Sequence, residues 1–236
     1  FDFVDFLKKA GQTLWQILPL TPTGYGDSPY QSCSTFAGNH YLIDLQLLVD
    51  EGYLKQEEIA SVRWNDTETK VNFGYLYNNK LTVLRTAYSR FGGSEEFDAF
   101  CRDNSSWLSD FALFMALKRH FDMRSWTEWE DEEIRLRRPA AMEKYRKLLK
   151  QDVELFIYIQ YLFYKQWTEL KAYINKLGIG VIGDLPIYVA MDSADVWAEP
   201  EFFQLDEKNM PVEVSGVPPD AFSEDGQFWG NPLYNW

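Results

Sequence analysis

Cysteine and histidine, which mark disulfide-bonded proteins and metal sites, are scarce in this chain of 236 residues. The only cysteines, Cys33 and Cys101, lie far apart without metal-ligand spacing, so we expect two buried free thiols and neither a disulfide framework nor a metal site. The only histidines, His40 and His120, have no acid or cysteine pair beside them, and we interpret both as structural. Because disulfides mark oxidising compartments, this cysteine usage favours a cytoplasmic protein.

Positive charge is also in short supply, with 23 basic residues against 36 acidic ones and a net charge of −13. Phosphate binding needs a basic face, so we expect no nucleic-acid partner and no anionic membrane partner. No apolar stretch reaches the length that spans a bilayer. Gly24 and Gly26 begin a dinucleotide-like pattern, but Pro29 stands where the third glycine belongs, so we expect no nucleotide cofactor.

Aromatic residues, by contrast, are abundant, at 17% of the chain, with 9 Trp, 14 Tyr and 17 Phe. Most of them must form the core. Those that fall in polar loops rich in Gly and Pro have another use, since a flat ring can stack on the apolar face of a sugar.

Two short apolar runs, residues 13–18 and 179–183, predict buried strands. Each follows a helical pattern that ends at a glycine: residues 2–11 end at Gly11, and a long helix with Asp152 as its N-cap ends at Gly178. This alternation is typical of α/β proteins.

Residues 41–176 are mostly helical in pattern, with 125–138 expected to be exposed and irregular. We expect a small hairpin in 201–214 and loops in 215–236. We therefore predict part of a (β/α)8 TIM barrel with a large helical insertion between two adjacent strands. The expected divisions are 1–45 (barrel segment), 46–150 (helical insertion) and 151–236 (barrel helix, strand and covering loop). Two strands cannot close a barrel, so we expect the chain to belong to a longer protein.

Asp184 is the foremost candidate for chemistry, because it directly follows the second predicted strand, where a parallel barrel carries its active site. Its alternative role is structural, as a cap of the next turn or a partner of an arginine. Tyr30 follows the first strand and would share that rim, either as a sugar platform or in loop packing. Trp229 is likewise either a core residue or a stacking platform.

The motifs together resemble a family. Residues 13–20 (TLWQILPL) lead into 24–32 (GYGDSPYQS), and 183–189 (GDLPIYV), 216–220 (GVPPD) and 229–234 (WGNPLY) follow in that order. This series is similar to the 4-α-glucanotransferases, also called amylomaltases or disproportionating enzymes, of glycoside hydrolase family 77. The resemblance covers nearly the whole chain.

The resemblance implies an enzyme that transfers α-1,4-glucan segments between maltooligosaccharides with retention, through a covalent glycosyl-enzyme intermediate and without a cofactor or metal. It implies that Tyr30 stacks near the cleavage site and that Asp184 supports the active site. It also implies that the groove is lined by Ser28, Asp220, Gln227 and Trp229, with Tyr25 in a secondary glucan site.

The family's nucleophile lies in an Arg-Ile-Asp-His-Phe-like strand that these 236 residues do not contain, and the acid/base and third acid follow it. We therefore expect this chain to be inactive alone, whereas the full-length enzyme is active. Two alternatives remain: a non-catalytic α-glucan-binding module, and a helical interaction domain with an acidic surface.

Overall fold

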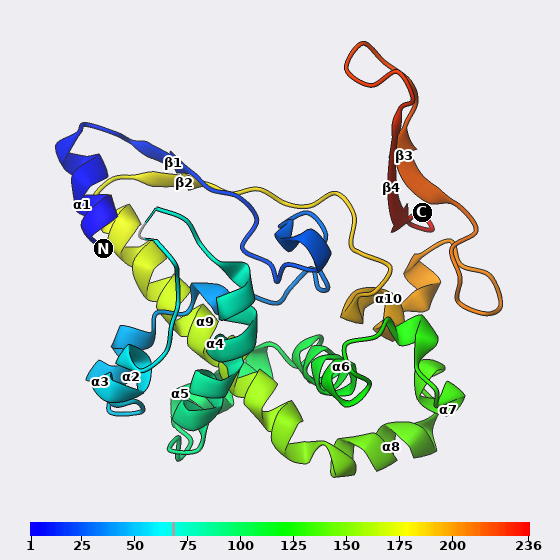
Figure 1. Cartoon of the computed structure of the whole chain (residues 1–236), viewed down its shortest axis with the longest axis horizontal. Helices are drawn as coiled ribbons and strands as arrows, with labels where there is room; N and C mark the ends of the chain where they lie inside the picture. The colour runs from blue at the N-terminus through cyan, green and yellow to red at the C-terminus, as the bar shows by residue number, and fades with distance from the viewer. Residues whose placement is uncertain (68) are drawn as a thin grey trace. The chain divides into compact units, whose positions relative to one another are not determined.

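Two stretches that are far apart in sequence form a parallel strand pair (Figure 1). The computed structural model describes residues 1–67 and 69–236, and the side chain of Tyr25 lies outside that description. Strand β1 (Leu14–Gln16) pairs in parallel with β2 (Gly180–Ile182), with Trp15 opposite Val181. The predicted adjacency of the two strands is confirmed, although both are shorter than expected. The described residues form no closed barrel, only this pair and one antiparallel pair.

The chain divides into two compact units, each made of separate stretches. Unit 1 comprises Phe1–Leu18, Gly38–Ser105 and Leu155–Asp184, and unit 2 comprises Pro19–Ala37, Ser106–Glu154 and Leu185–Trp236. The division into 1–45, 46–150 and 151–236 remains a prediction.

Unit 1 is largely helical. Besides β1 and β2 it contains α1 (Asp2–Lys9), η2 (His40–Leu42), α2 (Leu45–Asp50), α3 (Gln56–Ala60), α4 (Phe73–Tyr88), α5 (Glu95–Asp103) and most of α9 (Lys150–Lys176). Val4, Ile174 and Ile179 form a buried cluster that joins α1, α9 and the strand pair. Both helix ends follow the sequence prediction, because Gly11 and Gly178 adopt φ values of +74° and continue the chain toward β1 and β2. Asp152 lies in the first turn of α9 and not at its N-cap, because the helix begins at Lys150.

Two glutamines of α9 hold the segment that enters the helical part of unit 1. The Gln160 amide accepts from the Gly38 N–H (2.7 Å) and donates to the Gly38 carbonyl (3.1 Å). The Gln166 amide does the same with Asp44, at 2.8 and 3.0 Å. Each side chain thereby supplies both hydrogen bonds that a neighbouring strand would make.

Unit 2 combines helices with an antiparallel hairpin. Its elements are η1 (Tyr25–Asp27), α6 (Leu108–His120), η3 (Trp126–Glu128), α7 (Glu132–Arg135), α8 (Pro139–Leu148), α10 (Ala194–Ala198), η4 (Pro200–Phe202), β3 (Val214–Val217) and β4 (Gln227–Pro232). The expected small hairpin is present as a bridge between Leu205 and Pro211. The expectation of loops throughout 215–236 was wrong, because β3 and β4 pair there.

Residues 125–138 also depart from the prediction of an exposed stretch. Trp126, Trp129 and Ile134 are buried, and Trp129 stacks on Phe121 with the ring centroids 5.3 Å apart. The charged residues between these positions hide the apolar pattern, which is too short to show a helical period.

Candidate functional site

The segment that carries Tyr30 is folded by its own backbone and by Ser28. Ser28 accepts a hydrogen bond from the Tyr30 N–H at its Oγ (3.3 Å) and from the Gln31 N–H at its carbonyl (3.3 Å). The turn before it, η1, has positive φ at Gly26 and Asp27. Tyr30 is 47% exposed. Tyr25 belongs to η1, but its side chain lies outside the described residues.

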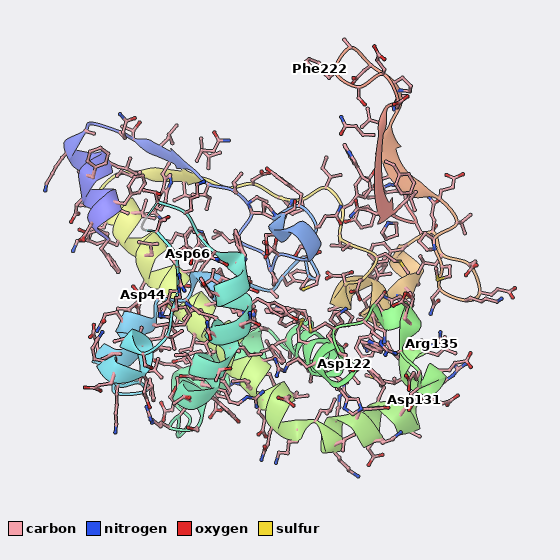
Figure 2. All side chains as sticks on the ribbon, viewed as in Figure 1. Asp44, Asp66, Asp122, Asp131, Arg135 and Phe222 are labelled. Carbon is pink, nitrogen blue, oxygen red and sulfur yellow. The ribbon has the colours of Figure 1, made fainter. Side chains whose placement is uncertain are left out.

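Three other candidates lie on the β3–β4 hairpin, all exposed. On β4, the Trp229 indole donates to Gln227 Oε1 at 3.0 Å, which fixes the indole against a polar neighbour. In the connecting loop, Asp220 Oδ1 accepts from the backbone N–H groups of Phe222 (2.8 Å) and Ser223 (2.9 Å). Phe222, 95% exposed, lies at the tip of this loop (Figure 2). Asp220 therefore shapes the loop with one oxygen.

A side-chain amide pair joins the Tyr30 segment to the Trp229 strand. Gln31 Nε2 donates to Asn231 Oδ1, and Asn231 Nδ2 donates to Gln31 Oε1, both at 3.4 Å. Ser28, Tyr30, Gln227 and Trp229 are thus carried by two segments that contact each other in unit 2. Sequence reasoning missed Asn231 as a site residue, because a motif asparagine gives no sign of being buried.

Asp184 is the last residue of unit 1, two positions after the end of β2, and its side chain is exposed. Its position after a parallel strand agrees with the pattern that singled it out. Its role in catalysis remains a prediction.

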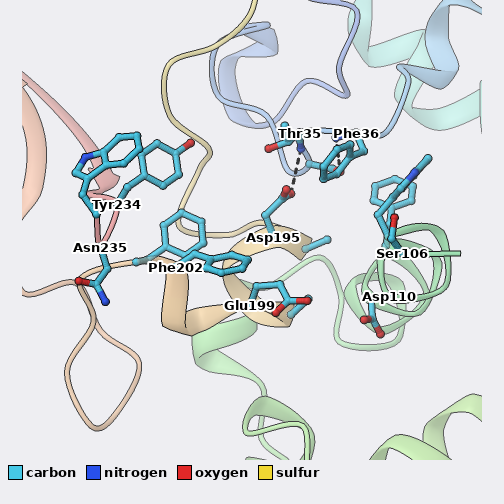
Figure 3. A pocket seen from close by; sticks show the side chains of 16 residues that line it. Thr35, Phe36, Ser106, Asp110, Asp195, Glu199, Phe202, Tyr234 and Asn235 are labelled. Carbon is cyan, nitrogen blue, oxygen red and sulfur yellow. Dashed lines mark hydrogen bonds between the residues drawn. The ribbon is translucent and has the colours of Figure 1, made fainter. Parts of the chain in front are cut away.

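Unit 2 also contains a cavity of about 610 Å³ that none of the predicted site residues line. Its walls include the stacked rings of Phe36 and Trp107, with centroids 6.0 Å apart. Figure 3 shows Tyr234 and Phe202 on one side of the cavity and Ser106 and Asp110 on the other. Sequence reasoning missed it because its lining comes from several separated segments.

Two acids that line this cavity have raised pKa values. Asp195 accepts from the Thr35 N–H at 3.0 Å, and burial raises the pKa of its carboxyl group (Figure 3). Burial, followed by the charge of Glu201, raises the pKa of Glu199. Nearby, burial and the carboxylates Asp192 and Asp195 raise the pKa of Cys33 to about 12, so this thiol stays protonated and supplies no nucleophile at neutral pH.

Both cysteines are free, as predicted, but half-buried and not fully buried. In the described part of the chain, no three His, Cys, Asp or Glu side chains gather as a metal site would require. No helix within residues 1–67 and 69–236 combines the length and apolarity needed to cross a bilayer.

Exposed aromatic rings beside amide and carboxylate groups form the kind of surface that suits a carbohydrate. The family model described as 4-alpha-glucanotransferase, glycoside hydrolase family 77, matches residues 1–236. The chain therefore belongs to this family.

Similar proteins support this family assignment. The chain is 49% identical over 239 residues to a 4-alpha-glucanotransferase of Clostridium butyricum, and 48% identical over 241 residues to one of Thermus thermophilus. These matches cover 100% of the chain but 49% and 47% of the relatives. The structure of an amylomaltase from Streptococcus agalactiae in complex with acarbose is 44% identical, with a TM-score of 0.96, over 100% of this chain and 48% of that one. The chain thus spans about half the length of the relatives it matches.

Proposed function

We propose that this chain is part of a cytoplasmic 4-α-glucanotransferase that transfers α-1,4-glucan segments between maltooligosaccharides with retention. The observation that carries the proposal is the contact between the Tyr30 segment and the Trp229 strand, two family motifs with exposed rings. The complex of the Streptococcus agalactiae amylomaltase with acarbose supports the same substrate class. The net charge of −13 is compatible with a neutral sugar.

In this proposal β1 and β2 are neighbouring strands of a (β/α)8 barrel, and the helices between them are an insertion. Asp184 follows β2 on the rim where substrate binds. There it orients sugar hydroxyls, while Tyr30 stacks on a glucose ring. Ser28, Asp220, Gln227 and Trp229 line the groove, and Tyr25 contributes to a secondary site.

Retention requires two displacements, each of which inverts the anomeric carbon. A carboxylate first attacks that carbon, and the leaving glucan takes a proton from an acid. A hydroxyl of the acceptor sugar then attacks the same carbon, breaks its bond to the carboxylate and gives its proton back to the acid's conjugate base. These 236 residues contain none of the three catalytic acids that the family motifs define, so the chain alone binds glucan without transferring it.

A chimaera tests this proposal. This chain replaces the matching half of the Clostridium butyricum relative, and the chimaera is incubated with maltotriose. We expect glucose together with maltooligosaccharides longer than maltotriose, whereas the 236-residue chain alone forms neither. Transfer by the chain alone, or a folded chimaera that yields only glucose and maltose, would contradict the proposal.

The alternative is a non-catalytic α-glucan-binding module, which the same exposed rings favour. The chimaera distinguishes the two functions, because a module would bind maltoheptaose while a folded chimaera showed no transfer.

A further inference from the structure

Asn231 is a polar residue buried within the exposed candidate surface. It is 4% exposed, whereas Trp229, two positions before it on β4, is 41% exposed. Asn231 Nδ2 donates to the Val189 carbonyl at 2.8 Å and to Gln31 Oε1 at 3.4 Å. Its Oδ1 accepts from Gln31 Nε2 and from Ser215 Oγ, both at 3.4 Å. An asparagine amide has two N–H donors and two acceptor lone pairs, so this side chain is fully satisfied.

A β-bulge places the amide there. Gly216 pairs with Phe228 and Val214 with Pro232, so the single residue between these pairs on β3 faces three residues on β4. Gly230 lies in the middle of the three with φ +77°, a conformation that side chains rarely adopt. Bulges redirect side chains, and this one turns Asn231 inward while the preceding tryptophan stays exposed.

The amide connects three segments of unit 2. Val189 is the last residue of the 183–189 motif, Ser215 belongs to β3, and Gln31 is the neighbour of Tyr30 in sequence. The Gln31 segment also packs closely on the chain before it, because Thr23 and Ser32 form an antiparallel bridge and a Cβ on Gly24 would lie 2.8 Å from the Gln31 carbonyl oxygen. Close backbone packing therefore leaves this segment little freedom, and the amide pair sets its position against β4.

We propose that Asn231 is a positioning residue, which fixes the spacing between the Tyr30 and Trp229 rings so that one glucan chain contacts both. This inference rests on the proposed function. Two weak contacts to one ligand add to its affinity only when both can form at the same time. Segments that are already ordered before the ligand arrives lose less entropy on binding. Loss of the amide pair should therefore lower the affinity for long ligands and leave the affinity for short ligands almost unchanged.

The test compares maltose with maltoheptaose, using tryptophan fluorescence titration of the 236-residue chain. Asn231→Asp keeps the shape of the side chain but replaces its two donors with acceptors that face the oxygens of Val189 and Gln31. We expect its maltoheptaose affinity to fall about tenfold or more, while its maltose affinity stays within about twofold. Asn235→Asp is the matched control. It introduces the same charge at an exposed asparagine with one side-chain contact, to Glu201 at 3.3 Å, and should change neither affinity.

Gln31→Met provides a second variant if Asn231→Asp does not fold. It removes the amide pair and keeps the Asn231 bond to Val189, and it should show the same dependence on ligand length. Combining Asn231→Asp with Trp229→Ala should weaken maltoheptaose binding no further than Trp229→Ala alone, because the positioned ring is already gone.

Equal losses for both sugars in folded variants, or no loss for maltoheptaose, would overturn the positioning role alone. If the unmodified chain bound no maltoheptaose, the proposed glucan function would fail, and this inference with it.

Discussion

His40 is a half-buried histidine at the start of η2. Its ring packs on Tyr41 at a centroid distance of 4.3 Å. Burial, followed by the nearby charge of Lys80, lowers its pKa from 6.5 to about 4. Lys80 is itself buried and donates to the Ile43 carbonyl. The folded protein therefore holds His40 in its neutral form at neutral pH.

This low pKa predicts a loss of stability in acid. Between pH 6.5 and about 4 the unfolded chain binds a proton at His40 that the folded chain does not, so the free energy of unfolding falls as the pH falls. We expect a contribution of about 3 kcal/mol over this window. Urea unfolding at pH 7, 5.5 and 4 measures it, and His40→Gln should flatten the pH dependence by that amount. Parallel curves for the two proteins would refute the assignment.

Where α9 packs against the segment at Gly38, there is less room for an added side chain than at any other described glycine. A Cβ on Gly38 would lie 1.9 Å from Cδ1 of the Phe163 ring, a distance at which something must move. The two hydrogen bonds from Gln160 hold the Gly38 backbone in place, so the strain cannot be relieved by a small shift of the loop.

Gly38→Ala should therefore lower the free energy of unfolding by about 2 kcal/mol through overpacking. Gly92→Ala is its control, because a Cβ there meets nothing within 4 Å and no positive φ is involved. That variant should be neutral or about 0.5 kcal/mol more stable. Urea midpoints compare the two, and Phe163→Leu should recover part of the loss. Equal midpoints for the two glycine variants would contradict the packing argument.

The elements also show how far the sequence leads. The helical pattern predicted for residues 41–176 covers α4, α6 and α9, and the glycines at 11 and 178 predicted where two helices end, because helical period and C-capping are local properties. The pairing of β3 with β4 was not predicted, because its bulge breaks the alternation of side chains. At the candidate site, exposed Tyr30 and Trp229 could be proposed from their loops. The burial of Asn231 depends on contacts nearly 200 residues apart, which no local pattern contains.

For the whole molecule, the parallel pair β1–β2 is one source of exposed apolar surface. Leu14, Leu18 and Ile182 are exposed on or beside these strands. Parallel sheets are normally covered on both faces, and the chain spans only about half of the relatives it matches. The proposed function implies that the other half of a full-length enzyme covers this surface.

The isolated chain should therefore bind the apolar dye ANS, and the chimaera should bind markedly less. Leu14→Lys with Ile182→Lys should reduce dye fluorescence in the isolated chain. Val71→Lys is the control at an exposed apolar residue outside the strand pair, and should have a smaller effect. Strong dye binding by a folded chimaera would show that this surface remains uncovered.

The hydrogen bonds from Gln160 and Gln166 of α9 to the backbone of Gly38 and Asp44 have a consequence for solubility. An extended segment with free N–H and C=O groups can add a strand from another molecule, which is a common first step of aggregation. At Gly38 and Asp44 these groups are already occupied by Gln160 and Gln166. Side chains of one helix can in this way satisfy backbone groups on both sides of η2, where other proteins would need an extra strand.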